Sequence, residues 1–227
     1  MTGIKLCGFQ TVEDVRMATR LPIESIGFVM VPGRRRTVSL DHLPEMLSAV
    51  PAGLKKVAVL KDASLVDAVA WQTRYSFDVL QLHGTESPAY CETLKKMVGV
   101  SLCKVFDASA RPVSEAGLSE YAPWIDRILL DSAQGGSGKS FDWTGIPQWQ
   151  KAAKAYGLPV WVAGGLHPDN VGALIRRYGP DGVDVSSGIE TDGRKDGLLI
   201  NRFVERVMAS GDEEERGGGT EGVLEIR

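Results

Sequence analysis

Eight short apolar or β-branched runs recur along the chain, and longer amphipathic segments separate them. The runs span residues 4–7, 26–31, 57–60, 79–82, 102–106, 128–130, 160–163 and 183–185. The separating segments have a helical period, and several open on a Thr, Asp or Ser that can cap a helix. They include residues 11–19, 40–49, 64–73, 88–97, 144–156 and 168–178. Strands that alternate with helices pair in parallel through crossover connections. An open doubly wound sheet and a closed (β/α)₈ barrel both fit this α/β pattern, and eight units in about 210 residues favour the barrel.

The length and composition suit one folded domain followed by a tail. With 227 residues, of which 43% are hydrophobic and 24% charged, the chain can bury one substantial core. We therefore expect a single barrel domain over residues 1–208. Residues 211–219 are highly charged, end in three adjacent glycines and have no apolar period, which predicts a solvated, flexible tail over residues 209–227. The alternative is that the short apolar stretch at residues 223–226 docks on the barrel.

Charge and hydropathy favour a small-molecule partner. The formal charge is −3 and the pI is about 5.7, so the chain has no basic field to hold nucleic acid. No apolar run approaches the roughly 18 residues of a membrane span. The cysteines Cys7, Cys91 and Cys103 are odd in number and lack C-x-x-C spacing, and no signal segment is visible, which predicts a reduced, cytoplasmic protein. The three histidines lie far apart in the sequence, so we expect no metal site.

Polar residues and glycines fall where the predicted strands end. They are Lys5 and Cys7 at the first run, Arg34, Arg35 and Arg36 after the second, Gln81 and His83 at the fourth, Asp131 after the sixth, Gly164 and Gly165 after the seventh, and Asp184 and residues 186–188 at the eighth. In a barrel all of them converge on the carboxyl-terminal face, where barrel enzymes place their active sites. An open sheet would scatter them, which is a second reason to expect a barrel.

Two of these loops predict a phosphate-binding site. Gly164 and Gly165 follow the seventh run, and Ser187 and Gly188 follow the eighth; at these two positions this fold binds phosphate through bare backbone N–H groups. Each glycine alone would be typical of a turn, but the pair favours phosphate. The glycine-rich loop that follows Asp131 in the run of residues 128–143 copies the last three positions of a nucleotide P-loop, yet an alanine stands where that motif needs its first glycine. We expect it to be a flexible segment that can fold over a ligand.

Cys7 and Asp131 are the candidate catalytic pair. Cys7 ends an apolar strand and would by default be a small core residue, but the neighbouring Lys5 and the rim position allow an activated thiolate. Asp131 could merely order its loop, yet a Cys and an Asp across a phosphosugar pocket form a base and an acid without a cofactor. One arginine of residues 34–36 would suit a carboxylate, with the other two solvated. His83, which in general packs more often than it catalyses, is a candidate substrate contact.

Six motifs occur along the chain in a characteristic order. They are Lys5-Leu6-Cys7-Gly8, Gly27-Phe28 with Arg36-Thr37-Val38-Ser39, Gln81-Leu82-His83-Gly84, the loop from Asp131 to Trp143, Ala163 to Val171, and Val183 to Glu190 with Lys195-Asp196. Together, over residues 4–203, they resemble the phosphoribosylanthranilate isomerase family of tryptophan biosynthesis. The resemblance implies a (β/α)₈ TIM barrel of the ribulose-phosphate-binding type. It also implies a cofactor-free Amadori rearrangement, the aldose-to-ketose isomerisation of N-(5′-phosphoribosyl)anthranilate to 1-(2-carboxyphenylamino)-1-deoxyribulose 5-phosphate.

The resemblance further implies roles for single residues. Asp131 matches the general acid that protonates the furanose ring oxygen, and Cys7 matches the general base that removes the C2′ proton. Arg36 aligns with the arginine that binds the anthranilate carboxylate, and Asp184 with an acid near the bridging nitrogen. The resemblance assigns the 5′-phosphate to the two glycine-containing loops described above. Among the departures from the family pattern, only Lys61 adds polarity at the pocket edge.

Two other functions fit part of this pattern. Another phosphosugar barrel enzyme would share both phosphate loops but in general lacks Cys7 paired with Asp131. A non-catalytic phosphosugar-binding protein would need neither residue. The sequence leaves open a second sugar-phosphate substrate and the choice between a monomer and a homodimer.

Overall fold

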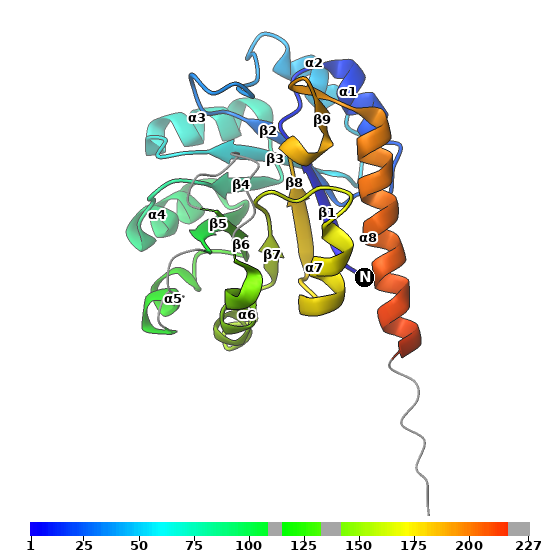
Figure 1. Ribbon diagram of the computed structural model, residues 1–227. Helices are drawn as coiled ribbons and strands as arrows, with labels where there is room; N and C mark the ends of the chain where they lie inside the picture. The colour runs from blue at the N-terminus through cyan, green and yellow to red at the C-terminus, as the bar shows by residue number, and fades with distance from the viewer. Residues whose placement is uncertain (109–114, 133–141, 218–227) are drawn as a thin grey trace, which may run out of the picture.

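The eight predicted runs are the eight strands of a closed parallel barrel (Figure 1). The structure is a computed structural model that describes residues 1–108, 115–132 and 142–217. The strands neighbour one another in chain order, and the eighth pairs with the first. Their bounds are β1 Gly3–Cys7, β2 Ser25–Val29, β3 Lys55–Leu60, β4 Val79–Leu82, β5 Ser101–Asp107, β6 Arg127–Asp131, β7 Val160–Val162 and β8 Gly182–Val185. The predicted barrel is confirmed, and the open doubly wound sheet is excluded.

Helices surround the barrel, and each of the six predicted helical segments overlaps one (Figure 1). The helices are α1 Val12–Ala18, α2 Leu43–Ser48, α3 Leu65–Tyr75, α4 Pro88–Val98, α5 Glu115–Tyr121, α6 Ile146–Lys154, α7 Val171–Tyr178 and α8 Gly197–Gly217. The side chains of Thr11, Ser64 and Ser87 cap α1, α3 and α4 by accepting a hydrogen bond from a first-turn N–H. Within the described ranges there are also four short elements: the 3₁₀ turns η1 Trp143–Gly145 and η2 Ser187–Ile189, and the hairpin strands β9 Glu190–Thr191 and β10 Arg194–Lys195.

The apolar core has two layers, because successive strand residues point to opposite faces. The larger layer fills the space between the strands and the helices. The smaller one lies inside the barrel and consists of Val57, Val79, Cys103, Val105, Leu129, Trp161 and Ala163. Stepping by two along the strands from this inner layer reaches Gln81 on β4 and Asp131 on β6. The same alternation therefore builds the inner core and aims the polar side chains above it into the barrel.

A single indole fills the amino-terminal end of the barrel. A Cβ atom on Gly182 would lie 2.2 Å from the Trp161 ring, and one on Gly3 would lie 2.7 Å from it, so the two glycines make room for the ring. The Arg127 guanidinium lies 4.3 Å from the centre of the ring. Because this end is filled, a ligand can enter the barrel only from the carboxyl-terminal end.

The last helix extends past the expected domain boundary. We expect the barrel to end at residue 208, but α8 continues to Gly217. It buries Ile200, Phe203 and Val207 and lies beside α7 (Figure 1). The rest of the expected flexible tail, residues 218–227, lies outside the described residues. None of the helices in the described ranges is long and apolar enough to cross a membrane.

Candidate active site

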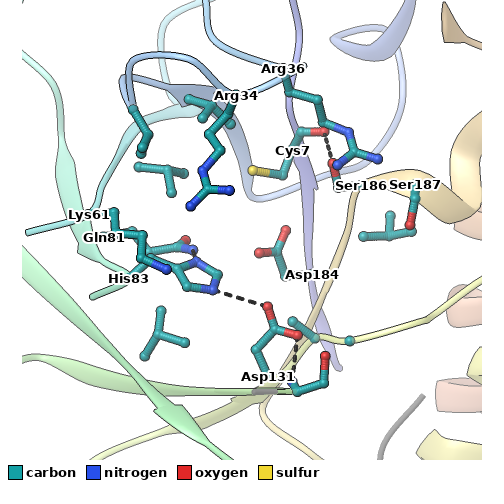
Figure 2. Close-up of a pocket in the computed structure, with 18 of the residues that line it drawn as sticks. Cys7, Arg34, Arg36, Lys61, Gln81, His83, Asp131, Asp184, Ser186 and Ser187 are labelled. Atoms are coloured by element: carbon teal, nitrogen blue, oxygen red, sulfur yellow. Dashed lines mark hydrogen bonds and ion pairs between the residues drawn. The ribbon is translucent and has the colours of Figure 1, made fainter. Parts of the chain in front are cut away.

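A cavity of about 700 Å³ opens at the carboxyl-terminal ends of the strands, and most of the predicted site residues line it (Figure 2). The predicted residues on its wall are Cys7, Arg36, His83, Asp131, Gly164, Gly165, Asp184 and Ser187. Arg34, Lys61 and Gln81 line it as well. Gly188 lies behind the wall, where the two glycine-containing loops meet. The loop of residues 133–141, which we expect to fold over a ligand, lies outside the described residues.

Cys7 lies buried at the end of β1, beside Gly27 of β2. A Cβ atom on Gly27 would lie 2.6 Å from the Cys7 Sγ and 3.1 Å from the Lys5 Nζ, so this glycine leaves room for both groups. Burial raises the pKa of the Cys7 thiol above its ordinary value of 9.0, and the positive charge of Lys5 offsets only part of that effect. With the groups that the chain itself supplies, the thiol is therefore protonated at neutral pH, and Lys5 alone does not produce the thiolate.

Lys5 is committed to a buried ion pair with Asp184 of β8. Its Nζ lies 2.7 Å from Asp184 Oδ2, and both side chains are buried. Burial by itself would lower the pKa of Lys5, but the Asp184 carboxylate more than compensates and raises it. The other oxygen, Asp184 Oδ1, is buried and accepts no hydrogen bond from any described residue. That oxygen is a ready acceptor for an N–H or O–H of a bound molecule.

Asp131 ends β6 as the third member of a hydrogen-bonded chain. Its Oδ2 lies 3.2 Å from His83 Nε2, and its Oδ1 accepts a hydrogen bond of 2.7 Å from the Ser132 N–H. The Gln81 amide nitrogen lies 3.3 Å from His83 Nδ1 (Figure 2). Because an amide nitrogen only donates, the Nδ1 accepts and the ring proton sits on Nε2, which faces Asp131. His83, expected to contact a substrate, thus also orients this carboxylate.

Two of the three adjacent arginines are bound to one carboxylate. Arg36 donates from Nε and Nη2 to Glu190 at 2.7 and 3.0 Å, and Arg35 donates from Nη2 to the same carboxylate at 2.5 Å. Lys195 adds a third cation at 2.9 Å. We call Arg35, Arg36, Glu190 and Lys195 the rim clamp, because they join the loop after β2 to the hairpin after β8. Glu190 binds the Nε/Nη2 edge of Arg36, and Arg36 also lines the cavity, so its expected contact with a substrate carboxylate stays a prediction.

The rim clamp makes the fold sensitive to acid. Burial would raise the pKa of Glu190, but hydrogen bonds from Arg36 and Arg35 and the charge of Lys195 lower it from 4.5 to about 2. A lowered folded-state pKa contributes stability above pH 4.5, and this contribution is lost as the pH falls toward 2.

Glu190→Gln should therefore lower the melting temperature at pH 7, by about 2–4 °C for each kcal/mol of stability lost. The difference in melting temperature between the variant and wild type should become smaller as the pH falls from 4.5 toward 2. Thermal melts at several pH values measure both effects. A difference that stays constant over this range would show that the ionised carboxylate does not contribute.

The loops after β7 and β8 form the opposite wall of the pocket. Gly164 and Gly165 adopt the left-handed conformation, with φ of 79° and 64°, which side chains disfavour. Neither glycine, nor Ser187, donates a backbone hydrogen bond to a described residue. Gly188 packs against the other loop so closely that a Cβ there would lie 1.9 Å from the Leu166 carbonyl oxygen. The two loops thus present bare N–H groups side by side, as anion binding requires.

Comparison with known proteins agrees with this geometry. A family model described as N-(5′-phosphoribosyl)anthranilate isomerase matches residues 4–206. The curated N-(5′-phosphoribosyl)anthranilate isomerase of Streptococcus pneumoniae (strain Taiwan19F-14) is 36% identical, over 91% of this chain and 96% of its own.

Two solved structures are similar as well. The phosphoribosyl anthranilate isomerase of Thermus thermophilus has a TM-score of 0.77 at 27% identity, covering 92% of this chain and 99% of its own. A structure described as monomers of the dimeric isomerase of Thermotoga maritima has a TM-score of 0.77 at 25% identity, covering 92% of this chain and 100% of its own.

Proposed function

The chain belongs to the N-(5′-phosphoribosyl)anthranilate isomerase family, and on that premise we propose that Cys7 and Asp131 are the base and the acid of its reaction. The reaction is an aldose-to-ketose isomerisation in tryptophan biosynthesis. One observation carries the proposal: a thiol on β1 and a carboxylate on β6 are both buried and both face the same cavity. The phosphate-binding loops lie on the wall beside them, which suits a phosphosugar that lies across the barrel mouth.

The proposed reaction begins at Asp131. The protonated carboxyl group gives its proton to the furanose ring oxygen, the C1′–O bond breaks, and the lone pair of the anthranilate nitrogen forms a C1′=N double bond. The nitrogen becomes positively charged at this point. Asp184 Oδ1, which has no partner among the described residues, is available to accept the N–H of that nitrogen. The Asp184 carboxylate therefore favours the charged intermediate by a hydrogen bond and by its negative charge.

Cys7 performs the second step. Its thiolate removes the proton from C2′, and the electron pair of that C–H bond moves to form the C1′=C2′ bond and to neutralise the nitrogen. The resulting enolamine takes up a proton at C1′ and loses the hydroxyl proton at C2′, which gives the ketone. Burial disfavours the thiolate. The cationic nitrogen formed in the first step is bonded to C1′, next to the C2′ atom that Cys7 deprotonates. Its positive charge therefore favours the thiolate at the step that needs the base.

The proposed phosphate-binding residues are Gly164, Gly165, Ser187 and Gly188. Gly164, Gly165 and Ser187 line the cavity, and their backbone N–H groups are bare toward the described residues. Gly188 keeps the loop after β8 in contact with the loop after β7. The substrate is thereby held by its phosphate, with its C1′ and C2′ atoms toward Cys7 and Asp131.

Gly188→Ala tests the phosphate site. The added methyl group would collide with the Leu166 carbonyl, so the two loops must separate and the N–H groups diverge. We expect KM for phosphoribosylanthranilate to rise about 10-fold or more, since misplacement by about 1 Å can cost 10²-fold. Gly145→Ala is the matched control, because among the described residues its Cβ would meet only the Ala108 carbonyl, at 3.9 Å. Equal KM values for both variants would remove Gly188 from the site.

The experiment that tests the whole proposal is an activity assay of the purified protein. Phosphoribosylanthranilate is generated in the cuvette, and the loss of its fluorescence is followed without any added cofactor or metal. Rapid loss with formation of the ketose supports the proposal. A folded protein that binds a phosphosugar without converting it would be a binding protein, and conversion of a different aldose phosphate would make it another phosphosugar barrel enzyme.

The protein is further proposed to act in the cytoplasm without need of a second copy. Cys7, Cys91 and Cys103 are free thiols, which suits a reducing compartment. All proposed site residues come from one chain, so a monomer suffices, and a homodimer like that described for the Thermotoga maritima relative is the alternative. Sedimentation at assay concentration distinguishes the two states.

A further inference from the structure

Lys195, on the hairpin after β8, is a buried cation to which the proposed reaction steps give no role. Its side chain is only 3% exposed. Its Nζ donates to the Ser186 carbonyl at 3.0 Å and to Glu190 at 2.9 Å, and it lies 5.4 Å from the centre of the Phe9 ring. A buried ammonium group is costly unless it is paired and hydrogen-bonded, and these contacts meet that need. The fold therefore holds one positive charge at a fixed point close to the end of β8.

Ser186 places that charge beside the proposed base. Ser186 follows β8, which pairs with β1. Its hydroxyl donates to the Cys7 carbonyl at 3.1 Å (Figure 2). The contact is close, since a Cβ on Gly8 would lie 2.9 Å from the same hydroxyl oxygen. Ser186 thus binds Lys195 through its carbonyl and Cys7 through its hydroxyl.

The nearer cation, Lys5, has its charge offset by a partner. Lys5 forms a buried ion pair with Asp184, so the two charges largely cancel at Cys7. In the rim clamp, by contrast, three cations share the one carboxylate of Glu190, and positive charge is left over. Lys195 has the least exposed side chain of these three cations, at 3% against 13% and 53%. Solvent therefore screens the charge of Lys195 least.

The titration of Cys7 agrees with this geometry. Burial raises the pKa of the thiol, and among the nearby charges Lys5 and Lys195 lower it while Asp184 raises it. Other charged or titratable groups line the cavity on the loops or strand ends after β2 to β6, namely Arg34, Arg35, Arg36, Lys61, His83, Asp107 and Asp131. Because Lys5 and Asp184 act in opposite directions, Lys195 is the adjacent cation whose effect is not cancelled by a neighbour on the barrel strands.

We propose that Lys195 is a positioning residue for Cys7: Ser186 fixes its ammonium group beside the end of β1, and its positive charge there favours the thiolate. This proposal rests on the proposed role of Cys7 as the base. Lys195 supplies what Lys5 alone does not, because Asp184 offsets the charge of Lys5. The hydrogen bond to Ser186 also joins the base to the proposed phosphate site, since Ser187 is the next residue.

Alkylation of Cys7 by iodoacetamide, without substrate, tests the proposal. The thiolate is the reacting form, so the rate reports its fraction, and peptide mass mapping identifies the modified cysteine. Rates are measured from about pH 7 to about pH 11 for wild type, Lys195→Met, Lys195→Arg and Lys195→Gln, which keeps an N–H donor without the charge. Arg35→Met is the matched control: it also removes one cation from Glu190, but the Arg35 side chain is 53% exposed and solvent screens its charge.

At about pH 8, Lys195→Met and Lys195→Gln should be alkylated about 10-fold more slowly than wild type, because one unit charge at a partly buried site changes a pKa by about one. The difference should shrink toward about pH 11, where the thiol ionises in every variant. Lys195, whose pKa burial lowers from 10.5, also loses its own charge there. Lys195→Arg should restore most of the wild-type rate, and Arg35→Met should stay within about 2-fold of it.

Three results would overturn the proposal. One is a wild-type rate at every pH in folded Lys195→Met or Lys195→Gln. Another is a rate lowered by the same factor at every pH, which would report restricted access to the thiol and not its charge. The third is equal slowing in Arg35→Met. The isomerase assay decides the proposed function separately: wild type that does not convert phosphoribosylanthranilate would refute it, whatever the alkylation rates.

Discussion

Asp131→Asn should lower kcat by about 10²- to 10⁴-fold, the usual contribution of a positioned acid. The amide keeps the shape of the side chain and can still accept the hydrogen bond from the Ser132 N–H. The amide has no acidic proton to give to the furanose oxygen, so ring opening slows. The phosphate-binding loops are unchanged, and KM should therefore shift little. Steady-state kinetics with phosphoribosylanthranilate, followed by fluorescence, measure both constants.

Asp107→Asn is the matched control for this prediction. Asp107 ends β5, pairs in register with Asp131, and also lines the cavity, so the substitution removes a carboxylate of the same rim. Asp107→Asn should retain near-normal turnover. Asp131 would not be the acid if Asp131→Asn kept near-normal turnover. The same would follow if Asp107→Asn lost as much turnover as Asp131→Asn.

The barrel and the place of the site could be predicted because both depend on short-range patterns. Each strand is an apolar run, and the period of two decides which side chains face the inside. The full length of helix α8 was harder to predict, because the high charge of its last residues is typical of a solvated tail. Its Ile200, Phe203, Val204 and Val207 nevertheless have helical spacing, which is the signal that could have identified it. The short α5, Glu115–Tyr121, offers little apolar pattern.

The partners of the charged residues could not be predicted, because they come from distant parts of the chain. Glu190, which binds Arg36, is 154 positions away in sequence, and Asp184, which binds Lys5, is 179 positions away. The sequence shows three equivalent arginines, and only the fold reveals that two of them share one carboxylate. In the same way, the sequence places Lys5 beside Cys7 but does not show that Asp184 partly neutralises it.

Cys7→Ala should also lower kcat by about 10²- to 10⁴-fold, because it removes the proposed base for the C2′ proton. The pH profile gives the more specific result. Since the thiolate is the base and burial raises the pKa of Cys7 above 9.0, only a small fraction of the enzyme is active at pH 7. That fraction grows about tenfold for each pH unit below the pKa. In wild type, kcat/KM, which reports the pKa values of the free enzyme, should therefore rise from pH 7 to pH 9 wherever deprotonation of C2′ limits the rate.

The residual activity of Cys7→Ala should lose this rising limb and become flat with pH. Cys91→Ala is the matched control: it removes a buried thiol of the outer apolar layer, whose pKa burial raises to about 11, without touching the cavity. It should keep both the rate and the pH profile of wild type. Near-normal turnover in Cys7→Ala would refute the role of base. A wild-type rate that is already constant from pH 7 to pH 9, with proton removal limiting, would mean that the pocket stabilises the thiolate more strongly than Lys5 and the cationic nitrogen explain.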